Sequence, residues 1–308
     1  MSVRQLEGVA QRQWTARSGA TELAVFEWGN PDGEPVVLVH GWPDTHVVWS
    51  SVVPLLSDRF RVIAYDTRGA GGSSAPKAVS AYRLDKLAAD FFAVIDAASP
   101  NVPVHVVAHD WGSIQVWEAV CTPRSNRRVA SFTSISGPSL DHLAMWMRGK
   151  LAAPTPRSVR APILQLISSL CALLLIVPVL PRLLLKIFGT ERMWTWLLGR
   201  VEGIPADDVH VADTLQHDMI TGLKIYRANV LQHVLRPRQQ YTTVPIQILV
   251  STRDVAIRPA GYDALGRWAS SVQRHDIPAG HWLPFSEPLV VAEAAANFID
   301  SLTLATAS

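Results

Sequence analysis

The sequence is poor in cysteine and in net charge, and each shortage argues against a class of protein. Two cysteines, Cys121 and Cys171, in 308 residues are too few for a disulfide framework, so we expect a protein of the reducing cytoplasm. A net charge of only +2 at pH 7 argues against nucleic acid as the main partner. Residues 1–8 contain charges and no apolar run, so no secretory signal is expected. What is abundant is apolar residues, 48% of the chain, enough for one large core or a core with an inserted lid.

Short apolar runs alternate with helical patterns over most of the chain. Such alternation is typical of an α/β protein with a mostly parallel sheet and helices on both of its faces. The first two predicted strands are joined through the turn Ser18-Gly19. Strands are predicted at 13–16, 22–28, 36–39, 61–65, 104–107, 129–135, 246–250 and 272–277, and helices at 46–56, 81–97, 114–120, 259–268 and 288–302.

The alternation is interrupted once, after residue 135, and resumes at residue 246. The intervening segment is rich in Leu, Trp and Pro, with helical spacing of apolar residues at 163–177 and 209–235. A single interruption just past a strand predicts a helical cap over the carboxyl edge of the sheet. We therefore divide the chain into a core in two parts, 1–137 and 241–308, and a cap at 138–240.

The stretch Ala108-His109-Asp110-Trp111-Gly112-Ser113 joins a buried type of strand to a helical pattern that begins at Ile114. Small residues around the bend suit the sharp turn of a nucleophile elbow, with Asp110 at its apex. A carboxylate is ionised near neutral pH and can attack a saturated carbon directly, which gives an alkyl ester of the enzyme. A histidine and an oxyanion hole are then needed to hydrolyse that ester. The simpler interpretation is that Asp110 only caps the following helix.

Other polar residues follow strands of the same predicted sheet. Asp254 comes after strand 246–250, and His281 comes after strand 272–277. The loop His40-Gly41-Trp42-Pro43 follows strand 36–39 and can aim a backbone N–H into a pocket. Because the carboxyl ends of parallel strands share one edge, we expect these groups to lie near the elbow. The order of nucleophile, acid and histidine is that of the α/β-hydrolases.

A glycine cluster at 66–73 raises the question of a nucleotide site. It lacks the spacing and the following helix of a dinucleotide-binding turn, so a structural turn is the favoured interpretation. We expect no cofactor and no metal in this chain.

Together these motifs resemble those of the epoxide hydrolases that have the α/β-hydrolase fold, and the match runs from near residue 14 to residue 308. The resemblance implies that Asp110 opens an epoxide to give, after ester hydrolysis, a vicinal diol. It implies that His281, oriented by Asp254, activates the water, and that the backbone N–H groups of Trp42 and Trp111 form the oxyanion hole.

The resemblance also assigns a proton donor in the cap. The segment Ile225-Tyr226-Arg227-Ala228-Asn229 is similar to the family segment whose tyrosine protonates the epoxide oxygen. The family usually has two cap tyrosines, but no tyrosine lies between Tyr82 and Tyr226 here. Either Tyr226 acts alone or another donor, such as His142, substitutes for the second tyrosine.

The pattern further resembles the hydrolase half of actinobacterial proteins that continue into a short-chain dehydrogenase. This resemblance implies a fused dehydrogenase domain beyond residue 308, which would bind the nucleotide cofactor.

Two other functions are compatible with parts of the sequence. A haloalkane dehalogenase resembles this chain in the Asp-Trp elbow and would bind halide through indole N–H groups, from Trp111 and one of Trp146, Trp194 or Trp196. However, Trp42 stands where that family commonly has Asn or Glu, and Tyr226 would have no role. A noncatalytic binding protein could also use this scaffold, because a fold does not dictate function.

Residues 161–181 contain no charge, with Arg157 and Arg160 before them and Arg182 and Lys186 after them. The length reaches the roughly 20 residues that span a bilayer. We expect no span, because it would separate the last two strands from the rest of the sheet. The segment is either buried in the cap core or forms a substrate entrance that contacts a membrane. The second interpretation suits a lipid epoxide and a protein peripheral to the inner face of the plasma membrane.

Overall fold

The computed structural model describes residues 10–152 and 154–307, and one eight-stranded sheet organises them. The strand order is β1-β2-β4-β3-β5-β6-β7-β8. The first three strands in this order pair antiparallel and all the others pair parallel, so the predicted mostly parallel sheet is confirmed. The strands are β1 (Arg12–Ser18), β2 (Thr21–Gly29), β3 (Pro35–Val39), β4 (Arg61–Tyr65), β5 (Val104–His109), β6 (Val129–Ile135), β7 (Ile246–Ser251) and β8 (Val272–Ile277).

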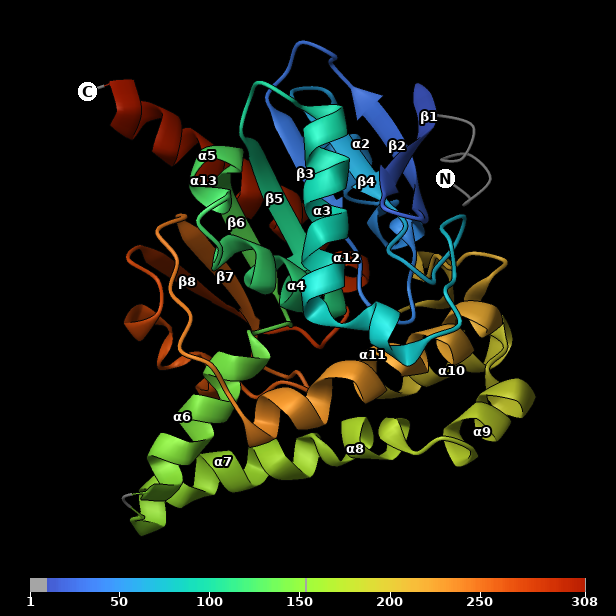
Figure 1. Ribbon diagram of the computed structural model, residues 1–308, viewed down its shortest axis with the longest axis vertical. Helices are drawn as coiled ribbons and strands as arrows, with labels where there is room; N and C mark the ends of the chain where they lie inside the picture. The colour runs from blue at the N-terminus through green and yellow to red at the C-terminus, as the bar shows by residue number, and fades with distance from the viewer. Residues whose placement is uncertain (1–9, 153, 308) are drawn as a thin grey trace.

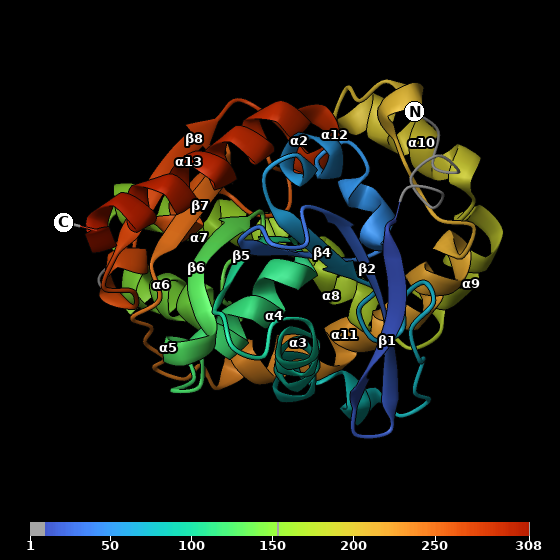
Figure 2. The ribbon, with the colours of Figure 1, turned by 90° about the horizontal axis from the view of Figure 1, so that it is seen from above.

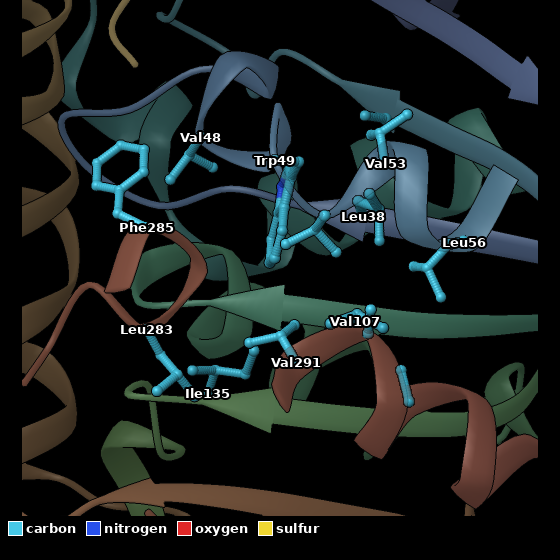
Figure 3. Packing of buried hydrophobic residues seen from close by; sticks show 14 of the residues in the cluster. Leu38, Val48, Trp49, Val53, Leu56, Val107, Ile135, Leu283, Phe285 and Val291 are labelled. Carbon is cyan, nitrogen blue, oxygen red and sulfur yellow. The ribbon is translucent and has the colours of Figure 1, made fainter. Parts of the chain in front are cut away.

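Helices cover both faces of this sheet, as Figures 1 and 2 show. The alternation of side chains along β3 illustrates the two hydrophobic layers. Val36 and Leu38 pack in one cluster with Trp49 (Figure 3), whereas Val37 and Val39 pack in the other. The first layer includes α2 (Val53–Ser57), α12 (Leu283–Ser286) and α13 (Pro288–Ala307), and the second includes α3 (Leu84–Ala98) and α4 (Trp111–Val120).

Among the described residues, six α-helices are inserted between β6 and β7, and they lie beyond the carboxyl ends of the parallel strands (Figure 1). The long α11 packs against the core, and α7, α8 and α9 follow one another along its outer side. The Arg227 side chain of α11 donates hydrogen bonds to the carbonyls at 176–178, which fixes the end of α8. The inserted helices are α6 (Leu140–Ala152), α7 (Pro156–Ser168), α8 (Leu170–Ile176), α9 (Leu180–Phe188), α10 (Glu191–Val201) and α11 (Leu215–Leu235).

Several predicted helices have different bounds in the structure. The helix expected at 46–56 is instead a 3₁₀ turn, η1 (His46–Trp49), followed by the short helix α2. The helix expected at 259–268 is instead two 3₁₀ turns, η4 (Pro259–Tyr262) and η5 (Leu265–Arg267). Gly261 and Gly266 in the latter stretch lower its helix propensity. The helix expected at 163–177 is divided between α7 and α8, and the one expected at 209–235 begins six residues later. The remaining short elements are η2 (Val79–Tyr82), α5 (Ser125–Arg128) and η3 (Ala206–Asp208).

Candidate active site

Asp110 lies at the apex of a sharp turn between β5 and α4, with φ +50° and ψ −125°. The turn leaves no room for side chains beside it. A Cβ on Gly112 would lie 2.3 Å from the Val39 carbonyl oxygen, and one on Gly137 would lie 2.1 Å from the Asp110 carbonyl oxygen. The Asp110 carboxylate makes no capping hydrogen bond to α4, so the interpretation of this residue as a simple helix cap is wrong. A strained residue held in this way is typical of a functional site.

His281 links Asp110 to Asp254 across the ends of three strands. Its Nε2 lies 3.6 Å from Oδ1 of Asp110, within ion-pair distance. Its Nδ1 lies 2.9 Å from Oδ2 of Asp254. The other Asp254 oxygen accepts hydrogen bonds from the backbone N–H groups of Ala256 and Ile257, at 2.7 and 3.0 Å. The structure therefore brings together the three residues that the sequence assigns to nucleophile, base and orienting acid.

Burial and charge act in opposite directions on this His–Asp pair. Burial disfavours the imidazolium form of His281, but the adjacent carboxylates of Asp254 and Asp110 outweigh it and hold the His281 pKa well above its usual value. Burial likewise disfavours the Asp254 carboxylate, but the charge and hydrogen bond of His281 outweigh that effect and lower the Asp254 pKa. In the free protein His281 is therefore protonated and Asp254 is ionised, so the two form an ion pair.

The loop after β3 presents a backbone donor to the carboxylate. The Trp42 N–H donates to Oδ2 of Asp110 at 2.9 Å. A Cβ on Gly41 would lie 2.4 Å from that oxygen and 2.7 Å from the Trp111 amide nitrogen, so only glycine allows the loop to approach both groups. Oδ2 of Asp110 therefore already occupies the position where an oxyanion would be held, with the Trp111 amide next to it.

The side chain of Trp42 joins this loop to the cap. Its indole N–H donates to the Met219 carbonyl of α11 at 3.0 Å. A Cβ on Gly222 would lie 2.1 Å from the indole ring of Trp42, so α11 can approach the ring this closely only with glycine at that position. The contact fixes α11, and with it Tyr226, relative to the elbow.

Tyr226 lies between two indole rings at the elbow. Its ring meets those of Trp42 and Trp111 edge-on, with centroids 5.4 and 4.8 Å away. Burial raises the pKa of the Tyr226 hydroxyl well above its usual value, and the charge of Asp110 raises it further. Tyr226 is therefore protonated at neutral pH and can supply a proton near Asp110.

His142, the other donor considered from the sequence, has its ring engaged elsewhere. The ring is stacked on Trp268, with centroids 5.0 Å apart and planes inclined by 6°. Its Nε2 lies 2.9 Å from the Gln240 carbonyl oxygen, so the proton on that nitrogen is directed at the backbone. Burial lowers its pKa to about 4. No described contact brings His142 to Asp110, which argues against it as the substitute donor.

Three residues that we did not predict also belong to the site. His109 Nε2 lies 2.8 Å from the His281 carbonyl oxygen and helps to hold that loop. Asp44 accepts a hydrogen bond from the Trp282 indole at 3.0 Å, while its Oδ1 is buried with no hydrogen-bond partner among the described residues. Burial raises the pKa of Asp44 to about 7. His109, Asp44 and Trp282 each lie next to a motif residue in the sequence, namely Asp110, Pro43 and His281. This adjacency is the signal by which the sequence could have identified them.

Within residues 10–152 and 154–307, no group of three or more His, Cys, Asp or Glu side chains is arranged to hold a metal ion.

Comparison with known proteins gives matches at both the family and the fold level. The family described as "alpha/beta hydrolase fold" matches residues 34–288. "Probable oxidoreductase EphD" of Mycobacterium tuberculosis is 45% identical over 284 residues, covering 90% of this chain but 48% of the relative. The chain thus spans about half the length of this curated relative.

Two solved structures share the architecture over nearly the whole chain. One is an epoxide hydrolase from metagenomes of hot environments, which is 25% identical to this chain and superposes with a TM-score of 0.72. The match covers 94% of this chain and 98% of that structure's chain. An epoxide hydrolase of Bacillus megaterium has a TM-score of 0.76 and covers 94% of this chain and 100% of its own, but at 20% identity it supports the fold alone. The predicted α/β-hydrolase fold and the resemblance to epoxide hydrolases are confirmed.

Proposed function

Because the chain belongs to the alpha/beta hydrolase fold family, we propose that it is an epoxide hydrolase that forms a vicinal diol through a covalent ester on Asp110. One observation carries the proposal. A carboxylate occupies the elbow, and a protonated tyrosine is held beside it by the two indole rings that flank it. An acyl hydrolase would need no acid of this kind next to its nucleophile, whereas epoxide opening needs a nucleophile and a proton donor together.

In the first step Asp110 attacks a carbon of the epoxide ring. Oδ2 is held by the Trp42 N–H, which leaves Oδ1 to form the new C–O bond. The C–O bond of the ring breaks, and the oxygen that leaves takes its proton from Tyr226. The product of this step is an alkyl ester of Asp110 with a neighbouring hydroxyl group.

In the second step water attacks the carbonyl carbon of the ester. Esterification removes the negative charge of Asp110, which is one of the groups that raise the pKa of His281. The His281 pKa should therefore fall, so that neutral imidazole becomes available as the general base. The oxyanion forms at Oδ2, where the Trp42 N–H already donates, and collapse of this intermediate releases the diol.

The site supports a dehalogenase less well, because no described contact brings the indole of Trp146, Trp194 or Trp196 to the elbow beside Trp111. The Trp42 indole at the elbow donates to the Met219 carbonyl. Trp196 is 59% exposed on the cap surface, and Trp194 packs against Trp282 rather than against the elbow. Halide release from haloalkanes, measured beside diol formation from matched epoxides, separates the two activities.

We also propose that the substrate is a lipid epoxide. The support is the apolar surface around Tyr226, to which α8 contributes Ala172, Leu175 and Ile176. Turnover should rise with the chain length of the epoxide, and a preference for short, water-soluble epoxides would contradict this proposal. If neither graded epoxides nor a panel of esters were turned over, a noncatalytic binding role would replace the enzymatic one.

A dehydrogenase half following this hydrolase in the whole protein is a further proposal. Its support is that the chain covers 48% of a relative named as a probable oxidoreductase. An immunoblot against the hydrolase in the source cells should reveal a polypeptide of about twice this length, and a band at 33.8 kDa alone would contradict it.

A single turnover in ¹⁸O-water with enzyme in excess tests the ester mechanism. The oxygen that enters the diol comes from Asp110, so the first diol released should be unlabelled and the label should appear in the peptide that contains Asp110. Acid-catalysed hydrolysis of the same epoxide is the control, because water then labels the diol directly. Labelled diol in the first enzymatic turnover would mean direct attack by water and would overturn the covalent step.

A further inference from the structure

The outer face of the cap is apolar and exposed. Of the 29 large apolar side chains that are exposed among the described residues, 18 lie between Ile163 and Val201, on α7, α8, α9, α10 and the turns between them. The stretch Val159–Ile176 is apolar and long enough to cross a membrane, yet only 11% of it is buried. Soluble monomers rarely expose contiguous apolar patches beyond a few hundred Å². Of the two alternatives for this segment, burial in the cap core is therefore wrong.

This face cannot belong to a helix that crosses a bilayer. β6 precedes the segment and β7 follows it, and the two strands pair in one sheet through Phe132–Ile135 and Ile246–Leu249. A crossing would place those partners on opposite sides of the membrane. Helix α9 instead has the pattern of a helix lying along an interface. Its residues Leu180, Leu183, Leu184 and Ile187 are exposed, while Leu185 packs against the core.

The charge of the cap face identifies what it contacts. Residues 156–201 contain six Lys and Arg and one Glu, which gives +5, whereas the whole chain carries +2. Arg182 and Lys186 of α9 form no ion pair with any described residue. The Arg227 side chain, which donates to the carbonyls at 176–178, adds a third cation between the end of α8 and the start of α9. Uncompensated cations beside an apolar surface are complementary to anionic phospholipid headgroups.

We propose that the face formed by α7, α8, α9 and α10 docks on an anionic phospholipid membrane and lies in its interface without crossing it. A second copy of the chain fits less well, because the unpaired Arg182 and Lys186 of two such faces would repel each other. The anionic cytoplasmic leaflet of the plasma membrane has the required chemistry.

Docking in this way would bring the membrane close to the proposed proton donor. One side of α8 packs in the cluster that contains Tyr226, and its other side exposes Leu173 and Leu174. A single helix thus separates Tyr226 from the membrane face. This step rests on the proposed function: the membrane that would supply a lipid epoxide lies one helix away from the proton donor that would act on it.

Vesicle co-sedimentation of the full chain tests the docking without any need for turnover. Binding to vesicles of phosphatidylcholine with phosphatidylglycerol should be at least tenfold tighter than to phosphatidylcholine alone, and it should weaken as salt is added. Joint Leu183→Glu and Ile187→Glu changes on α9 should abolish it. Joint Arg182→Gln and Lys186→Gln changes should weaken binding to the anionic vesicles roughly 30-fold, at about 1 kcal/mol for each charge.

Matched changes on the core are the controls. Leu55→Glu with Leu289→Glu alters two exposed leucines outside the cap, and Arg12→Gln with Arg267→Gln removes two exposed charges there. Both pairs should leave vesicle binding unchanged. The Leu183→Glu, Ile187→Glu variant should also keep its turnover of a short soluble epoxide and lose turnover of an epoxide carried in vesicles.

No binding of the unmodified chain to anionic vesicles at low salt would overturn the docking proposal. A dimer in sedimentation that the α9 changes dissociate, with no vesicle binding, would show instead that a second copy covers the face. Vesicle binding without turnover of any epoxide would refute the proposed function and leave the docking intact, so the two failures are distinguishable.

Discussion

Replacement of Tyr226 by phenylalanine removes one hydroxyl and should remove most of the epoxide opening. The aromatic ring keeps its edge contacts with Trp42 and Trp111, at 5.4 and 4.8 Å. Because only the hydroxyl is removed and the ring contacts are kept, the change should cost the folded state no more than about 1 kcal/mol. The loss of one general acid lowers the rate by roughly 10²- to 10⁴-fold, or about 3–5 kcal/mol in the activation barrier. The full factor is expected because Tyr226 is held between the indole rings of Trp42 and Trp111 at the elbow, where the leaving oxygen needs its proton.

The assay is single-turnover formation of the alkyl ester, followed by rapid quenching and mass spectrometry. Ester formation should slow by the stated factor, whereas hydrolysis of the ester should not change, because Tyr226 protonates only the first leaving oxygen. Tyr82→Phe, a buried tyrosine of the same cluster, is the matched control and should keep its activity. His142→Phe, which preserves the stacking on Trp268, should also cost little. If Tyr226→Phe lost less than tenfold, or if His142→Phe lost more than Tyr226→Phe, the assignment of the acid would be refuted.

The remaining predictions concern the base and a buried carboxyl. The His281→Gln variant should accumulate the ester, because ester formation does not need the base and ester hydrolysis does. The ester would be seen as a mass increase on Asp110 after incubation with epoxide. An unmodified Asp110 would contradict this order of steps. Asp44→Asn should raise the temperature of unfolding at pH 8, and the gain should shrink as the pH falls toward 4. The folded state raises the Asp44 pKa from 3.8 to about 7, so ionisation costs stability from pH 4 upward and the whole cost is present above pH 7. An equal gain at pH 4 and pH 8 would mean that Asp44 is not the group responsible.

The sequence by itself determined the sheet and the chemistry at its edge. β-Branched runs such as 104–107 specify buried parallel strands whatever surrounds them, and small residues around Asp110 specify a bend that bulkier side chains would block. Parallel strands end at a common edge, so residues that follow separate strands, Asp254 and His281, could be placed together without knowledge of the packing. The helix predicted at 259–268 was wrong, and the one predicted at 46–56 was right only in its second half, because helix propensity is a weak guide over short stretches that contain Gly or Pro.

The tertiary structure alone decided which groups meet across the cap and the core. Tyr226 reaches Asp110 because Gly222 lets α11 approach Trp42, a contact between residues 180 positions apart for which no local pattern exists. Asp44 and Trp282 pair in the same way, at a separation of 238 residues. The apolar run at 161–181 suits a buried helix and a membrane-facing helix equally well by composition, since both favour apolar residues. Only its position on the outer side of α11, where the core cannot cover it, decides that the run is exposed.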